Sequence, residues 1–184
     1  MAEGIVFPEF EIIDEFPVNA KQVAAGLDFG YSSDPTAIVK CGILDGRLYL
    51  DEQCYRTHML TSEIIKELKK LGLFVYADSA DPRLIQEIAN AGIIIFPADK
   101  YKGSVMGGLF KMMEYKLCVT KRSVNYIREL KNYVYEQNKD GKFINQPIDA
   151  YNHLIDGTRY YTIGKLLGKV LTSKQYSKGD LGIY

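Results

Sequence analysis

The stretch GLDFGYSSDPTAIVKCGI, residues 26–43, places an acidic residue inside an otherwise apolar segment. Residues 23–29 have the composition of a buried β-strand, GYSSDP that of a turn, and residues 36–43 that of a second strand rich in β-branched side chains. Asp28 interrupts the first strand, and burying a carboxylate without a partner is costly. Taken alone, Asp28 is therefore either a buried acid without a functional role or a ligand for a cation.

The chain continues with a hairpin and then with alternating helices and strands. Asp45-Gly46 is a hairpin signal between two strand-like runs, so three antiparallel strands open the fold. Apolar spacing and capping residues predict helices over about 61–71, 82–91, 102–116, 123–132 and 149–167, with short strands at 73–77, 93–96 and 117–120. Because a strand–helix–strand order implies parallel pairing, we expect an α/β fold with a mixed central sheet, three antiparallel strands followed by parallel ones, and flanking helices.

Length and composition indicate one domain. The chain has 184 residues and is 47% hydrophobic, which is enough for a core of its own. We expect an irregular lead-in over residues 1–20, the folded domain over 21–168 and a polar tail over 169–184, with a Lys/Asn-rich accessory β-hairpin at about 133–145 that turns at Asp140-Gly141. Three cysteines without metal-ligand spacing, no signal peptide and no apolar run of about 20 residues indicate an intracellular, reducing setting and no membrane segment.

Two further acids stand where the local pattern favours apolar residues. Asp78 ends the buried run LFVYAD, and Asp156 lies in the last predicted helix. If that helix crosses the sheet, Asp28, Asp78 and Asp156 meet, and clustered carboxylates repel one another unless a hard cation such as Mg²⁺ or Mn²⁺ lies among them. Gly157, which costs about 1 kcal/mol of helix propensity relative to Ala, indicates that the helix approaches the sheet closely. These residues favour a metal site.

Other polar residues nearby have competing interpretations. His153 lies one helical turn before Asp156 and shares its face, which favours a role in the site over an ordinary helical histidine. Asp81 is most simply the N-cap of the helix that follows it, with a peripheral role in the site as the alternative, and Asp78 could also provide that cap. Asp34 is typical of a turn, with a peripheral role in the site as the alternative.

These motifs together resemble a known family. GLDFGYSSDPTA, YADSADP, KGSVMGGL and NHLIDGTRY occur in the order typical of the C-terminal nuclease domain of the large terminase subunit of tailed bacteriophages and prophages. The similarity covers roughly residues 5–165, and the combination of DFGYSSDPTA with NHLIDGTRY makes it specific. It implies an RNase H-like fold and a nuclease that cuts concatemeric viral double-stranded DNA.

The resemblance also implies roles and partners. Asp28, Asp78 and Asp156 match a carboxylate triad that holds two divalent metal ions, Mg²⁺ or Mn²⁺, for phosphodiester hydrolysis. His153 matches a histidine found beside the third carboxylate in a number of relatives, and the hairpin matches one that flanks the active-site groove. The implied partners are DNA, an N-terminal ATPase motor domain of the same full-length protein, the small terminase subunit and the portal, in the cytoplasm of the host cell. No GxxxxGK[ST] phosphate loop is present, so we expect the nuclease half alone.

DNA binding is expected to depend on phosphate contacts, because the sequence contains no recognition helix or zinc module. The formal net charge is zero, so bound metal ions would supply the positive charge that a polyanionic substrate requires. The candidate cationic contacts are Lys100, Lys102, Lys121, Arg122, Lys139, Lys142 and Arg159.

Three other functions match parts of the pattern. GLDFGYSSDPTAIV also resembles the phosphate hairpin of actin-like ATPases and sugar kinases, but those proteins need two related domains and a second glycine-rich motif. Holliday-junction resolvases share the expected fold and chemistry, and preference for branched DNA would identify one. A DNA-binding module with a decayed site is disfavoured because all three acids are present.

Overall fold

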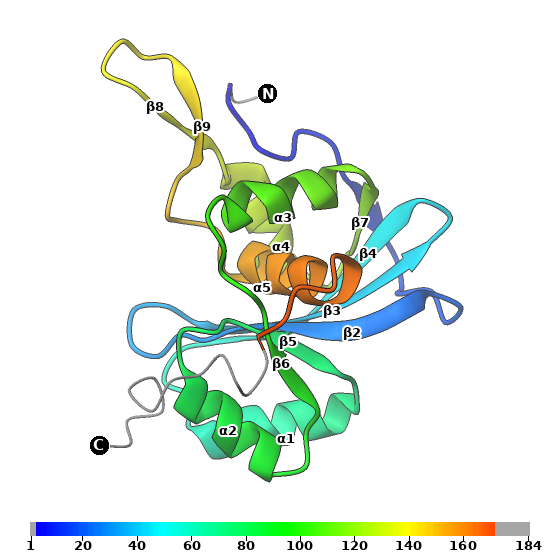
Figure 1. The fold of residues 1–184 in the computed structure, drawn as a ribbon. Coiled ribbons are helices and arrows are strands. Elements are labelled where there is room, and N and C mark those ends of the chain that lie inside the picture. Colours follow the sequence, from blue (N-terminus) through cyan, green and yellow to red (C-terminus); the bar gives the residue numbers. More distant parts are fainter. Residues whose placement is uncertain (1–2, 172–184) are drawn as a thin grey trace.

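Seven strands form a central sheet in the order β1-β7-β4-β3-β2-β5-β6, in a computed structural model that describes residues 3–171 (Figure 1). Strand β3 is antiparallel to β2 and β4, whereas β1–β7, β4–β7, β2–β5 and β5–β6 are parallel pairs. The mixed sheet predicted from the sequence is therefore confirmed. The strands are β1 (Glu11–Ile13), β2 (Lys21–Asp28), β3 (Thr36–Leu44), β4 (Arg47–Arg56), β5 (Val75–Ala77), β6 (Ile95–Pro97) and β7 (Lys116–Thr120).

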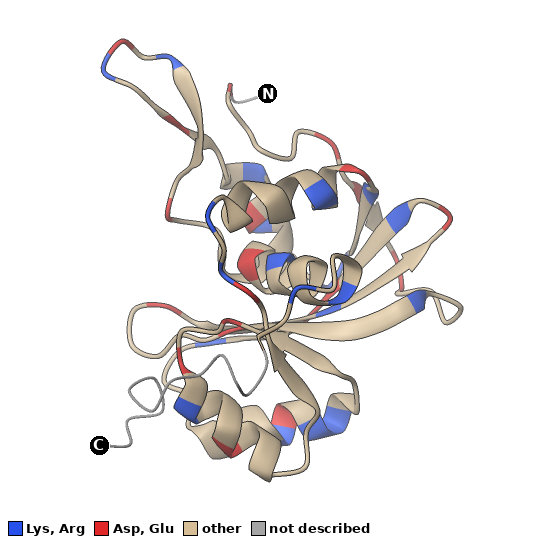
Figure 2. Cartoon of the chain, viewed as in Figure 1, with Lys and Arg blue, Asp and Glu red and all other residues tan. Residues whose placement is uncertain are grey.

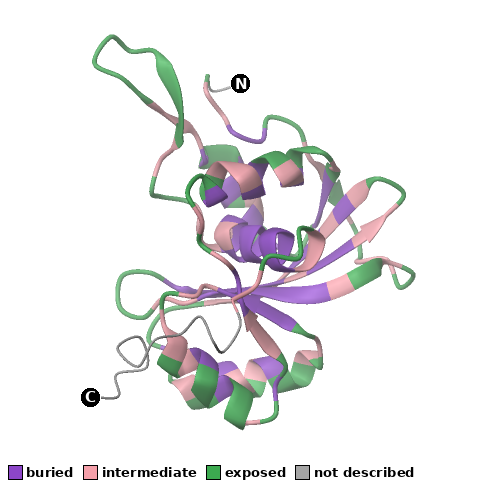
Figure 3. Cartoon of the chain, in the orientation of Figure 1, coloured by how far each residue is buried: buried purple, intermediate pink, exposed green. Residues whose placement is uncertain are grey.

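Helices cover both faces of this sheet, as Figure 1 shows. Helices α1 (Thr61–Leu71) and α2 (Pro82–Asn90) lie on one face, and α3 (Ser104–Met113), α4 (Val124–Asn132) and α5 (His153–Tyr161) lie on the other. A π-helical segment, η1 (Thr162–Leu166), continues α5. Each face has its own apolar cluster, and the larger one surrounds α5, which is almost entirely buried in Figure 3. Burial on both faces explains why β2 and β3 are apolar without alternation.

The accessory hairpin forms a separate two-stranded sheet of β8 (Tyr135–Gln137) and β9 (Phe143–Pro147). Its turn is held by the side chain of Asn138, which accepts backbone hydrogen bonds from Asp140 and Lys142, and Gly141 adopts a φ of 75°. The hairpin projects from the domain on the side where α5 begins (Figure 1).

Local signals account for most element boundaries. Gly72 ends α1 in the left-handed conformation, with a φ of 61°. Asp81 caps α2, since its Oδ1 accepts a hydrogen bond from the backbone of Leu84 at 3.1 Å, as predicted. Helix α1, by contrast, is not capped by Thr61 or Ser62, because Glu63 reaches back to the backbone N–H of Leu60.

Two predicted boundaries are wrong. Residues 1–20 are not an irregular lead-in throughout, because β1 pairs in parallel with β7 and forms the edge of the sheet. The last helix begins at His153, not at Asp149, since Tyr151 has a φ of 54° and Asn152 is the N-cap residue. Most of the predicted tail lies outside the described residues. Among the helices of residues 3–171, none has the length and apolar character of a membrane span.

Candidate active site at one edge of the sheet

Asp28 and Asp78 lie side by side because β2 and β5 are parallel neighbours. The register pairs Leu27 with Ala77, so the next residue of each strand is an aspartate at the carboxyl edge of the sheet. The backbone N–H of Asp78 donates to the carbonyl of Leu27 at 3.2 Å, which extends this register by one step. Open α/β sheets place ligands at this edge.

Helix α5 brings the third acid to the same edge by lying directly on β2. A Cβ atom built on Gly26 would be 1.9 Å from the carbonyl oxygen of Gly157, so the two backbones are in contact. The close approach predicted from Gly157 is therefore present, and Gly26 is its counterpart in the strand. The contact sets Asp156 and, one turn earlier, His153 above the end of β2.

Each acid contacts one basic side chain of the chain itself. The pairs are His153 Nδ1 with Asp28 Oδ2 at 3.2 Å, Arg159 Nε with Asp156 Oδ1 at 3.1 Å, and Lys100 Nζ with Asp78 Oδ1. The structure thus brings all four predicted site residues to one place.

Burial and mutual repulsion oppose ionisation of Asp28 and Asp156. Burial raises the pKa of Asp28 to about 6, and the carboxylates of Asp156 and Asp78 act in the same direction. Burial also raises the pKa of Asp156, against the effect of Arg159. The hydrogen bond to Asp28 raises the pKa of His153. The site therefore gathers negative charge that a cation would stabilise.

The donor set has the chemistry that Mg²⁺ and Mn²⁺ prefer, since it consists of carboxylate oxygens from three separate elements. Within residues 3–171, no three His, Cys, Asp or Glu side chains converge tightly enough to enclose an ion. Instead, Lys100 and Arg159 each hold one acid. Metal binding by Asp78 would use its Oδ2 or would displace Lys100 from Oδ1.

Asp34 lies at the margin of this cluster. Its Oδ1 is 3.7 Å from His153 Nε2, and its side chain is 64% exposed. The histidine therefore bridges Asp28 on the inner side and Asp34 on the outer side. Asp81, which caps α2, is the simple structural residue that was expected.

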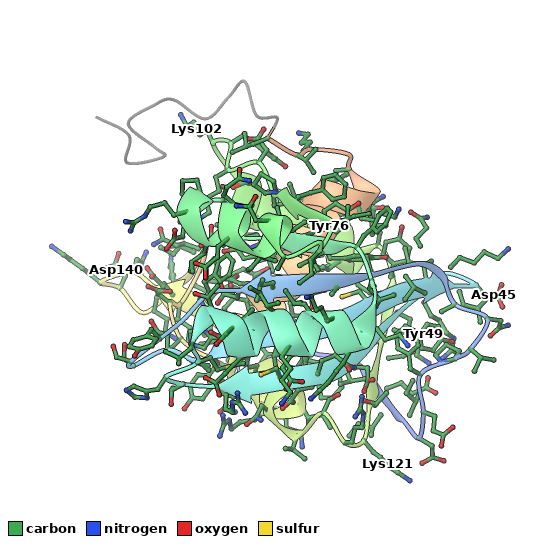
Figure 4. All side chains as sticks on the ribbon, turned by 90° about the horizontal axis from the view of Figure 1, so that it is seen from below. Asp45, Tyr49, Tyr76, Lys102, Lys121 and Asp140 are labelled. Atoms are coloured by element: carbon green, nitrogen blue, oxygen red, sulfur yellow. The ribbon has the colours of Figure 1, made fainter. Side chains whose placement is uncertain are left out.

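The predicted cationic residues do not form one DNA-binding face. Lys and Arg are spread around the molecule in Figure 2, and Lys102 and Lys121 lie on opposite sides of it in Figure 4. Lys121 pairs with Asp14 at 2.9 Å, and Arg122 holds the carboxylate of the buried Asp51. Arg122 therefore has a structural role at the end of β7, whereas the Lys121–Asp14 pair is exposed and weak, so Lys121 stays a predicted contact.

Arg159 also differs from its prediction as a DNA contact. It is 5% exposed and packs against α3, where a Cβ on Gly108 would be 2.4 Å from its Cγ. Its guanidinium pairs with Asp156 and lies 4.8 Å from the ring centroid of Tyr160. Arg159 is therefore a partner of the acid. Lys139 and Lys142, in the exposed turn of the hairpin, remain predicted contacts.

The sequence interpretation missed Glu129 of α4, which is fully buried. Its Oε2 accepts hydrogen bonds from the backbone N–H groups of Leu154, at 2.8 Å, and Ile155, at 3.0 Å. These donors belong to the first turn of α5, where no helical carbonyl can accept them. Its position in SVNYIRELKN is typical of an ordinary helix surface, so no local signal identifies it.

Two grooves flank the acids. One of about 720 Å³ lies on the side of His153 and includes Arg56 and Arg128, neither of which was predicted to be functional. The other, of about 500 Å³, lies between Asp156 and the base of the hairpin and includes Lys100. Residues 149 and 152 line both, so the grooves meet at the start of α5.

Comparison with known proteins relates this arrangement to phage terminases. A family model described as the terminase RNase H-like domain matches residues 28–163. The PBSX phage terminase large subunit of Bacillus subtilis (strain 168) is 27% identical over 169 residues, covering 84% of this chain and 39% of that protein. The terminase large subunit of Bacillus phage SPP1 is 32% identical over 167 residues, covering 86% and 40%.

The fold is also that of a solved domain. The crystal structure of the g2p (large terminase) nuclease domain from bacteriophage SPP1 with bound Mn gives a TM-score of 0.75 at 29% identity and covers 84% of this chain and 96% of that chain. The predicted α/β, RNase H-like fold is confirmed by this likeness. The chain spans about 40% of the length of the curated relatives it matches.

Proposed function

Because this chain belongs to the terminase RNase H-like domain family, the nuclease domain of large terminase subunits, we propose that it is a metal-dependent endonuclease that cuts double-stranded DNA. The observation that carries this proposal is that Asp28, Asp78 and Asp156 lie together at the carboxyl ends of β2 and β5, beside His153 and between two grooves. The Mn-bound relative supports the choice of cofactor.

The three acids would hold two divalent ions, Mg²⁺ or Mn²⁺, which supply an activated water and neutralise charge on the phosphate and on the leaving 3′ oxygen. Asp28 is the most buried of the three acids, 7% exposed, and would hold the ions together with Asp78 and Asp156. Lys100, released from Asp78, would be free to contact a phosphate oxygen.

The role of His153 follows from its two ring nitrogens. The Nδ1 faces Asp28, which fixes the ring orientation, whereas Nε2 is directed toward Asp34 in the exposed loop. A proton at Nε2 can therefore be delivered on the open side of the site, near the leaving oxygen.

The biological setting proposed here is that of the relatives. The domain would cleave concatemeric viral DNA within a larger protein that carries an ATPase motor, together with a small terminase subunit and a portal, in the cytoplasm of an infected cell. The share of the relatives that this chain covers leaves room for such a motor elsewhere in the full-length protein.

A plasmid-nicking assay with Mn²⁺, Mg²⁺ or EDTA tests the function. The wild-type chain should nick supercoiled DNA with either metal and not with EDTA. Asp28→Asn, Asp78→Asn and Asp156→Asn should each reduce nicking to background with an unchanged circular dichroism spectrum. Asp45→Asn is the matched control, because Asp45 lies in the β3–β4 turn, at the opposite end of the molecule from the hairpin residue Asp140 in Figure 4. Undiminished nicking by any triad variant would contradict the assignment of that acid.

A further inference from the structure

The groove on the His153 side contains positive charge that the proposed chemistry does not use. It is bounded by the loop 33–35, the end of β4, helix α4 and residues 149–153, and His153 itself forms part of its wall. A DNA strand that extends from the three acids toward His153 would therefore enter this groove directly.

Arg128 is the main cation of this groove. Its guanidinium carbon lies 5.8 Å from the ring centroid of Tyr55, which also lines the groove. Other arginines of the region are committed to acids, as Arg122 is to Asp51 and Arg159 is to Asp156. Within residues 3–171, Arg128 forms no such ion pair, so its guanidinium fork is available to an external anion.

A second guanidinium and an exposed aromatic ring complete the groove. Arg56 pairs with Glu63 at 3.2 Å, but both side chains are about half exposed, so a phosphate can displace this weak pair. Tyr151 is 45% exposed and has a φ of 54°, a backbone conformation uncommon for a bulky residue and frequent at functional sites.

The acidic residues of the groove restrict where an anion can bind in it. Asp34 and Asp149 also line it, so the groove as a whole is not strongly positive. Asp149 is engaged by the side-chain amide of Asn152 at 3.1 Å, and Asp34 faces His153. An anion that enters must therefore approach along the side formed by Arg56 and Arg128, away from these two acids.

We propose that this groove binds the DNA strand on one side of the scissile phosphate, with Arg128 contacting a neighbouring phosphate and Tyr151 packing against the sugar or base. The inference rests on the proposed nuclease function and adds the path of the substrate to it. A guanidinium binds phosphate through paired hydrogen bonds, and aromatic rings stack on bases without regard to sequence. The groove thus contributes affinity without sequence preference, as a nuclease of this kind needs.

Binding of a short fluorescent DNA duplex, measured by anisotropy with Ca²⁺ over a range of salt concentrations, tests the proposal. Arg128→Ala should weaken binding by roughly tenfold and reduce the slope of log K against log salt by about 1. Arg128→Lys should restore the slope but only part of the affinity. Lys69→Ala, on the exposed surface of α1, removes the same charge far from the groove and should change neither quantity.

Tyr151→Ala provides a second, independent variant, and it should weaken binding without changing the salt slope, because it removes stacking but no charge. Wild-type affinity and slope in both Arg128→Ala and Tyr151→Ala would overturn the groove assignment, even if Asp28→Asn still abolishes nicking. Conversely, a chain that binds DNA through Arg128 but never nicks it would uphold the groove and contradict the proposed nuclease function. Failure of the wild-type chain to bind DNA would overturn both.

Discussion

At the scale of single residues, the geometry of the site depends on a carboxylate that lies outside it. Glu129 accepts the first-turn N–H groups of α5 and so fixes the end of the helix from which His153 and Asp156 project. Its Oε1 has no hydrogen-bond partner among the described residues. A buried acid in this position serves as the cap that Asn152 does not provide with its side chain.

The titration of Glu129 should make stability depend on pH. Burial raises its pKa to about 7, from 4.5. The folded protein thus binds this proton more tightly than the unfolded chain does, so the stabilisation is complete below pH 4.5 and is lost as the pH rises through about 7. Glu129→Gln keeps an acceptor for Leu154 and Ile155 but cannot ionise. Between pH 4.5 and pH 7, the free energy of unfolding of this variant should therefore fall less than that of the wild type, by on the order of 2 kcal/mol.

Urea denaturation of both proteins at several pH values measures this difference. The acids of the site, Asp28 and Asp156, also have raised pKa values and contribute a slope of the same sign to both proteins. Subtracting one curve from the other therefore leaves the contribution of Glu129, including its effect on His153, whose pKa it raises. Parallel curves would show that folding does not shift the pKa of Glu129.

The site residues were predictable to the extent that they break a local pattern. Asp28 and Asp78 each stand at the end of an apolar strand, and His153 is three residues from Asp156. All four residues can therefore be recognised from ordinary strand and helix patterns. Glu129 and Arg128 have no such mark, because polar residues are common on a helix and only the tertiary contacts show which of them are buried or face a groove.

At the scale of elements, the contact between β2 and α5 decides where the third acid lies. Gly26→Ala would force its Cβ into the carbonyl of Gly157, at 1.9 Å, and backbone atoms cannot yield as a flexible side chain can. We expect a loss of about 3 kcal/mol in the free energy of unfolding and a lower nicking rate, since α5 must move away with Asp156. Thermal unfolding and nicking of the same preparation measure both effects.

Gly157→Ala is the graded comparison for this contact. Its Cβ would meet Val39 and Gly26 at 3.3 to 3.4 Å, which is tight but not overlapping. The gain of about 1 kcal/mol in helix propensity offsets much of this crowding, so stability should change little. If Gly157→Ala were as destabilising as Gly26→Ala, a Cβ at Gly157 would not be better tolerated than one at Gly26, which would contradict this description of the contact.

Elements with strong periodic patterns were predicted well, and the exceptions are short or follow unusual backbone. Strand β1 has only three residues and follows Pro8 within a few positions, so its sequence has no measurable period. Asp149 is a typical helix N-cap residue, but the left-handed Tyr151 delays the start of the helix to His153. Neither the edge pairing of β1 nor this turn is encoded locally.

At the scale of the whole molecule, the charge distribution poses a problem for a DNA-binding protein. The net charge is zero, and in Figure 2 the basic residues of the described part, 3–171, are scattered along the chain among acidic ones. The acids at the edge of the sheet would repel phosphates, and the basic partners Lys100 and Arg159 neutralise only part of their charge. Binding of DNA should therefore require the cation that cleavage requires.

This requirement predicts that metal controls affinity as well as chemistry. At constant ionic strength, Ca²⁺ should tighten binding of a short duplex to the wild-type chain by roughly tenfold over EDTA, because the cation removes repulsion at the contacted phosphate. Asp28→Asn combined with Asp156→Asn removes two charges, so this variant should bind more tightly than wild type in EDTA and gain little from Ca²⁺. Asp45→Asn, in its distant turn, should keep the wild-type response. Equal affinity of wild type and the double variant in EDTA would mean that the bound phosphates lie away from the acids. The path proposed for the DNA strand would then be wrong.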